Sequence, residues 1–143
     1  MKPIAVALAF ATLLAAPVAA QEAAPVVDCL SKCPAGTVAP RFEFLPRMEI
    51  TDASVGAYDR RSRTFAQFEA VIAPDGTIEP ESLVLTGGTA RQTESEVRRA
   101  LAQARFTPGR SDGAAVRARV RLRFDFEAEG TSWVKYTYKV TAR

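Results

Sequence analysis

The residues with the clearest chemical potential in this sequence are four arginines at alternate positions, followed two positions later by an aspartate. The positions between them are apolar. Strict alternation over residues 116–126 predicts a half-buried antiparallel strand, whose alternate side chains project from one face about 6.6 Å apart. Such a row of guanidinium groups is a candidate site for an anionic partner. The candidate partner-binding residues are Arg117, Arg119, Arg121, Arg123 and Asp125.

Two hypotheses explain this arginine row. In the first, the row is the solvated face of a sheet and pairs with Gln67 and Glu69 of a neighbouring strand, or with Glu79 or Glu81. Exposed ion pairs of this kind each contribute about 0–1 kcal/mol. In the second, like charges in one row repel unless an anionic partner lies over them, such as an acidic peptide or a phosphorylated lipid head group. Both hypotheses are consistent with the sequence.

The residue types of common catalytic and metal sites are scarce. The 143 residues contain no histidine, which excludes Ser-His-Asp and Cys-His catalytic arrangements and imidazole metal ligands. The carboxylates and hydroxyls show no spacing that suggests a shared site. We therefore expect a protein without enzymatic activity, cofactor or bound metal.

Residues 1–20 have the features of a secretory signal peptide, namely Lys2, an apolar run and small residues before an expected cleavage site after Ala20. The alternative is an uncleaved inner-membrane anchor, but the stretch is short for a membrane span and is broken by Pro17. We expect periplasmic localisation, with inner-membrane anchoring if the leader is retained. Export argues against a nucleic-acid partner, so the net charge of +3 is expected to favour an acidic envelope surface or peptide.

Cys29 and Cys33 are the only cysteines. In an oxidising compartment, two thiols this close together in a flexible segment are expected to form a disulfide. The loop between them is short and constrains little chain entropy, so the expected stabilisation is small. Because the spacing is not the Cys-x-x-Cys of thiol oxidoreductases, a redox function is disfavoured.

The rest of the chain is expected to form one domain preceded by less regular segments. Residues 21–40 are rich in Ala, Pro and Val and are expected to form an extended tether that carries both cysteines. Residues 41–64 are expected to pack on the domain as an irregular segment. The domain itself is expected over residues 65–143.

The domain pattern begins with two predicted strands. Small or apolar residues alternate from Ala66 to Ile72, Asp75-Gly76 supplies turn chemistry, and an extended pattern resumes over residues 77–85. Pro80 cannot donate to a strand ladder, so we expect the second strand to lie at a sheet edge or to carry a bulge.

A predicted helix and two further strands complete the domain. Thr93 to Glu96 has the form of a capping box, and the residues after it place Val97, Ala100, Leu101 and Ala104 on one stripe. The arginine strand follows, and alternation over residues 133–141 predicts a fourth strand that forms a hairpin with it. The expected fold is α+β, a small antiparallel sheet of three to four strands in the order β-β-α-β-β with one main helix packed on one face.

These elements carry a set of turn, core and helix-end residues in a characteristic order. They are Asp75-Gly76, Ile78, Leu83, Thr86-Gly87-Gly88, Val97, Leu101, Arg105-Phe106-Thr107-Pro108, Gly113, Val116, Val120 and Phe124. This ordered set resembles the C-terminal domain of the TonB family of energy transducers. The resemblance covers about half of the chain, roughly residues 65–127.

The resemblance implies a periplasmic binding or adaptor module that recognises an extended peptide of an outer-membrane transporter or another envelope protein by strand addition, in association with TonB-dependent transport across the outer membrane. The edge of the arginine strand is the expected site. If residues 132–141 occupy that edge, this strand must detach or the partner must use another edge. The proline-rich spacer usual in such transducers is absent from the sequence, so energy transduction by this chain alone is not expected.

Three alternatives stay open at this level. The chain could be a structural envelope protein that contacts anionic lipid or another acidic surface through the arginine row. With a retained leader, it could be a membrane-anchored transducer. Two copies could also form a homodimer by pairing exposed strands.

Overall fold

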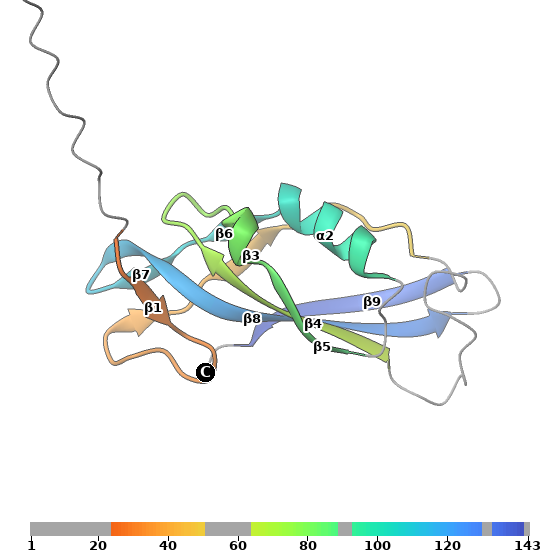
Figure 1. Ribbon diagram of the computed structural model, residues 1–143, viewed down its shortest axis with the longest axis horizontal. Helices are drawn as coiled ribbons and strands as arrows, with labels where there is room; N and C mark the ends of the chain where they lie inside the picture. Colours follow the sequence, from red (N-terminus) through yellow and green to blue (C-terminus); the bar gives the residue numbers. More distant parts are fainter. Residues whose placement is uncertain (1–23, 51–63, 89–92, 130–132, 142–143) are drawn as a thin grey trace, which may run out of the picture.

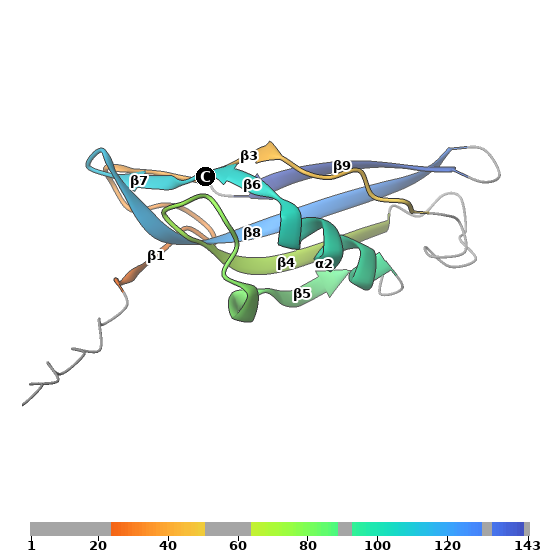
Figure 2. The same cartoon turned by 90° about the horizontal axis from the view of Figure 1, so that it is seen from above.

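The computed structural model describes residues 24–50, 64–88, 93–129 and 133–141. The expected signal peptide, residues 1–20, lies outside this range, and so do residues 51–63 of the expected irregular segment. The described chain is α+β, with a long twisted sheet that is mostly antiparallel and one α-helix on one face of it (Figures 1 and 2). The expected fold class is therefore confirmed, although the sheet has more strands than expected.

The arginine strand is the centre of this sheet. It forms β8 (Ala114–Glu129), which pairs antiparallel with β4 (Thr64–Ile72) on one side and with β9 (Trp133–Thr141) on the other. The alternation has the predicted consequence, because every second side chain from Ala118 to Phe126 is buried. The buried residues are Ala118, Val120, Leu122, Phe124 and Phe126.

The predicted first hairpin forms, with a shorter second strand than expected. After the Asp75-Gly76 turn, the expected strand over residues 77–85 is reduced to an isolated bridge between Ile72 and Ile78 and is then interrupted by the short 3₁₀-helix η1 (Pro80–Ser82). Pro80 has no N–H to donate to the ladder. Strand β5 (Val84–Gly88) then pairs with β4 at the margin of the sheet and shifts its register there. The expected edge position is confirmed.

The predicted helix is α2 (Glu94–Gln103). Its apolar stripe packs on the sheet, as the spacing predicts, and Arg98 pairs with Glu94 at 2.8 Å. The capping box is not formed, because Thr93 has φ −89° and ψ −3° and its side chain makes no capping hydrogen bond. A capping side chain requires an extended backbone at this position, whereas Thr93 is already helical and fully buried.

The segments expected to be a tether and an irregular stretch contribute three strands. β1 (Val26–Asp28) lies parallel to β8, and β2 (Thr37–Val38) pairs with β7 (Gly109–Ser111). β3 (Arg41–Phe44) and β6 (Arg105–Thr107) form a separate two-stranded sheet. Within the described residues the main sheet thus has seven strands. The tether prediction fails where β1 and β2 form, because strands of two or three residues are too short to produce a visible period of two.

The core lies between the main sheet and the layer formed by α2, β3 and β6 (Figure 2). Phe42 of β3 is partly buried and packs against this core, with its ring centroid 4.5 Å from that of Phe106 and 4.9 Å from that of Tyr138. Met48 and Ile50 are also buried, so the described part of the 41–64 segment packs on the domain through apolar side chains. The N-terminal segments therefore belong to the folded unit that positions β8 and β9.

Candidate functional site

The arginine row faces away from this core, and two of its members bind carboxylates of neighbouring elements. The Nε and Nη2 atoms of Arg117 donate to the two carboxylate oxygens of Glu79 at 2.6 and 2.7 Å. Arg121 donates to Glu69, which lies directly opposite it on β4, at 3.2 Å. Both carboxylates were expected as pairing partners from the sequence.

Arg123 is engaged within its own strand. It pairs with Asp125 at 2.8 Å, and its guanidinium lies 4.1 Å from the centroid of the Phe65 ring. The carboxylate of Asp125 is therefore already bound by a neighbouring cation. The structure thus places all five candidate residues on one face of β8. All of them except Arg119 form ion pairs within the protein.

Two cations on this face have no ion pair among the described residues. Arg119 is exposed and lies opposite Val71 of β4 and Asp28 of β1 in the strand register. Lys139 of β9 is also exposed and lies directly opposite Arg123. Among the described residues of this face, these two are the cations most available to an anionic partner.

The Arg117–Glu79 pair makes stability depend on pH. The hydrogen bonds from Arg117 hold the pKa of the Glu79 carboxyl below its ordinary value, and partial burial opposes this shift. A carboxyl whose pKa is lower in the folded state contributes stability above its unfolded pKa, about 4.3, and loses it as the pH falls through the folded pKa. We expect Glu79→Gln to lower Tm by a few degrees at pH 7 and to lower it progressively less below pH 4.

Thermal denaturation followed by circular dichroism between pH 3 and pH 7 measures this effect. Glu81→Gln is the matched control, because Glu81 lies on the same 3₁₀-helix and is exposed. It removes the same charge without breaking the bidentate contact. A Tm difference that is the same for both variants at every pH would show that the Arg117 contact does not stabilise the fold.

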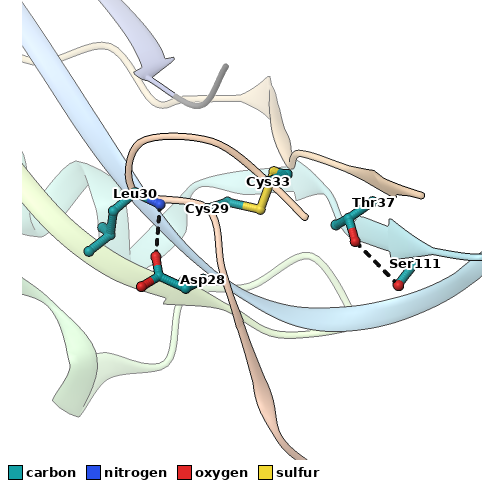
Figure 3. Close-up of a disulfide and its surroundings, with 6 residues drawn as sticks. All are labelled: Asp28, Cys29, Leu30, Cys33, Thr37 and Ser111. Carbon is teal, nitrogen blue, oxygen red and sulfur yellow. Dashed lines mark hydrogen bonds between the residues drawn. A yellow bond between two sulfur atoms is a disulfide. The ribbon is translucent and has the colours of Figure 1, made fainter. Parts of the chain in front are cut away.

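The predicted disulfide is present between Cys29 and Cys33 (Figure 3). Cys29 is fully buried, and its backbone N–H donates to the carbonyl of Arg119 at 2.8 Å. The Asp28 carboxylate accepts a hydrogen bond from the backbone N–H of Leu30 at the start of the same loop. The disulfide thus closes a loop next to β1, at the point where β1 pairs with β8.

The expected binding edge, that of β8, is occupied on both sides. β4 pairs with its residues 118–126, β9 pairs with 121–129, and β1 pairs with 117–119 on the side of β9. Backbone groups of β8 along this stretch are therefore already in ladders. Four described strands of the main sheet pair on one side only, and the two longest of them, β5 and β9, lie at opposite margins (Figure 2). The other two are the short strands β1 and β2.

An apolar hollow adjoins β9. It has a volume of about 460 Å³ and lies between residues 38–42 and the C-terminal part of β9. Val38 is 64% exposed and Tyr138 is 43% exposed, so the hollow presents apolar surface to solvent. The lining residues are Val38, Ala39, Pro40, Arg41, Phe42, Tyr138, Lys139 and Val140.

A second, polar hollow lies on the opposite face of the sheet, over β8 and β9. Its volume is about 510 Å³. The Nε of Arg121 and the Oγ1 of Thr141 are buried beside it and have no hydrogen-bond partner among the described residues. The lining residues are Gln67, Arg121, Arg123, Asp125, Phe126, Glu127, Thr137, Lys139 and Thr141.

Sequence reasoning missed the apolar hollow. Val38 belongs to a two-residue strand, and Tyr138 lies in an alternating pattern that suggests ordinary burial. The alternation over residues 133–141 does identify a strand, but it contains no information on which neighbour covers each edge. The sequence signal that was available is the pair of lysines, Lys135 and Lys139, which is typical of an edge strand.

Comparison with protein-family models, with curated proteins and with solved structures finds no match to this chain. Among the described residues, His, Cys, Asp and Glu side chains form no group of three that could hold a metal ion. The described helices include none that is long and apolar enough to cross a membrane. The arguments for function therefore depend on the geometry of the sheet, its edges and its two hollows.

Proposed function

We propose that this chain is a non-enzymatic binding or adaptor module of the periplasm, which recognises an extended segment of an outer-membrane transporter or another envelope protein by strand addition. The signal-peptide features of residues 1–20 support the location. The order of strand, turn, strand, helix and strand supports the resemblance to the TonB C-terminal domain, in which an extended peptide is the ligand. Association with TonB-dependent transport is part of the same proposal.

The observation that carries the proposal is an edge of β9 that pairs with no described strand and lies beside an apolar hollow. β9 pairs with β8 over nine residues without a register shift, so its other edge presents a regular row of backbone donors and acceptors. An added strand gains hydrogen bonds from such a row and gains specificity from pockets for its alternate side chains. The hollow formed with Val38 and Phe42 is one such pocket.

The second margin of the sheet is less suited to strand addition. β5 has five residues, its register shifts opposite Gln67, and it ends in Gly87 and Gly88. An incoming strand would meet an irregular and short row of backbone groups there. We therefore assign the binding edge to β9, in place of the β8 edge expected from the sequence.

The lipid-contacting alternative has less support from the arginine row. Arg117, Arg121 and Arg123 are bound to carboxylates of the protein, and anionic head groups would have to compete with these contacts. A homodimer formed by two β9 edges would bring Lys139 of each copy near the same interface, which like-charge repulsion disfavours. An extended segment of a different protein avoids that cost.

Binding of a neutral extended probe tests the proposal. We expect a fluorescent peptide of four Val-Gln repeats with Gly-Ser tails to bind the protein in an anisotropy titration. Val38→Asn should weaken this binding about tenfold, because it leaves an amide to be desolvated in an apolar hollow. Since Val38 is exposed, the substitution should not alter the fold.

Val84→Asn is the matched control, because Val84 is 52% exposed and lies on the other margin strand. It should leave the affinity for the peptide unchanged. The reverse result, with Val84→Asn weakening binding and Val38→Asn neutral, would place the site on β5 and contradict the assignment. Absence of peptide binding by the unsubstituted protein would contradict strand addition at either margin.

A further inference from the structure

The polar hollow lies beside the same strand as the apolar hollow, but on the other face of the sheet. Thr137, Lys139 and Thr141 of β9 line it together with side chains of β8. A strand added to β9 would send every second side chain to this face and the intervening ones to the face of Tyr138. The two hollows therefore act on alternate side chains of one ligand.

The polar hollow contains hydrogen-bonding groups that lack a partner. The Nε of Arg121 can only donate a hydrogen bond, and the Oγ1 of Thr141 can donate one. Both atoms are buried and unpartnered in the described structure. Buried polar groups are nearly always hydrogen-bonded in proteins, so a ligand that supplies acceptor oxygens would satisfy them.

The charges around the hollow favour an anionic acceptor. Lys139 lies opposite Arg123, and like charges in directly opposite positions are unfavourable. The two carboxylates that neutralise this region, Glu69 and Asp125, are already bound by Arg121 and Arg123. The remaining acidic lining residue, Glu127, lies opposite Lys135 in the register.

We infer that the segment captured at β9 alternates acidic and apolar side chains, with a carboxylate in the hollow of Arg121, Lys139 and Thr141 and an apolar side chain beside Val38 and Tyr138. This inference depends on the proposed strand addition and names its ligand. A carboxylate supplies two acceptor oxygens without a donor, which matches the unpartnered donors. Hydrogen bonds between charged groups also give the stronger contacts.

Two matched peptides test the inference. The first has four Val-Glu repeats and the second has four Val-Gln repeats, both with the same Gly-Ser tails. In low salt, we expect the Val-Glu peptide to bind about tenfold more tightly, as a charged hydrogen bond of ordinary strength implies. Raising the ionic strength to about 0.5 M should reduce the difference, because exposed charges such as Lys139 are then screened.

Substitution of Lys139 locates the carboxylate. Lys139→Gln should weaken Val-Glu binding several-fold and leave Val-Gln binding unchanged. Lys32→Gln removes the same charge from an exposed site in the disulfide loop, away from both hollows, and should affect neither peptide. Thr141→Val should likewise weaken Val-Glu binding selectively, because it removes one of the two unpartnered groups, the Thr141 hydroxyl.

The outcomes separate the inference from the function on which it depends. Equal affinity for the two peptides, or a Val-Glu preference that Lys139→Gln and Lys32→Gln alter equally, would overturn the acidic specificity while strand addition stands. Failure of both peptides to bind would overturn strand addition at β9 and the inference with it. Selective loss of Val-Glu binding in Lys139→Gln and Thr141→Val, but not in Lys32→Gln, is the result that the structure predicts.

Discussion

Replacement of Phe124 with alanine is expected to lower the free energy of unfolding by about 3–5 kcal/mol. Phe124 is fully buried on the central strand, and its ring centroid lies 6.3 Å from those of Phe42, Phe68 and Tyr138. The substitution removes the side chain that joins β4, β8, β9 and the β3–β6 layer. It should therefore leave a cavity that these elements can close only in part.

Urea denaturation followed by circular dichroism measures this loss. Phe44→Ala is the control, because Phe44 is 55% exposed at the end of β3 and its loss should change the free energy of unfolding by no more than about 0.5 kcal/mol. Equal losses for the two variants would contradict the placement of Phe124 at the centre of the core.

Replacement of Gly76 with alanine is expected to cost about 3 kcal/mol or more, for two separate reasons. The residue has φ +81°, a left-handed backbone conformation that is unfavourable for residues with a Cβ atom. A Cβ placed there would also lie 2.1 Å from the carbonyl oxygen of Phe106. Relief of this overlap would disturb the hydrogen bond from the Phe106 N–H to the Gly76 carbonyl, now 2.8 Å long.

Gly113→Ala separates the two contributions. Gly113 has nearly the same φ, +85°, but an added Cβ meets no atom within 4 Å. Its expected cost is that of the left-handed backbone alone, about 1–2 kcal/mol. If urea denaturation gives the same loss for both variants, the packing of the β4–β5 turn against β6 contributes nothing to stability.

The elements that could be predicted from the sequence are those long enough to show a repeating pattern of apolar residues. β4 and β8 alternate over many residues, and α2 carries a four-residue apolar stripe. In each of these elements most buried side chains are those of the apolar pattern, because the apolar face packs away from water. The position of β9 next to β8 also follows from the short link between two alternating runs.

The short strands could not be predicted, because their pairing depends on partners distant in the sequence. β1 and β2 have two or three residues each and pair with strands roughly seventy to ninety positions away. One further signal was present in the turn Asp112-Gly113, where both residues have positive φ and join β7 to β8 as a two-residue hairpin loop. Asp-Gly is a strong hairpin signature, and it could have identified β7.

The candidate site was only partly predictable. Alternation places the arginines of β8 on one face, and Glu69 and Glu79 were among the partners expected for them, but the sequence does not reveal which arginine each carboxylate binds. The occupied edges of β8 depend on where β1 and β9 come to lie, which is a property of the whole fold. For the same reason, the exposure of Val38 and Tyr138 beside β9 becomes visible only in three dimensions.

Hydrogen exchange resolved to single backbone amides tests the central claim most directly, because an added strand must bond to the outer edge of β9. Every second amide of Trp133–Thr141 should exchange quickly in the free protein and become protected when the Val-Gln peptide is added. The amides of Val84–Gly88 should not change. Unchanged exchange along β9 in the peptide complex, or new protection confined to β5, would contradict capture of an extended segment at β9.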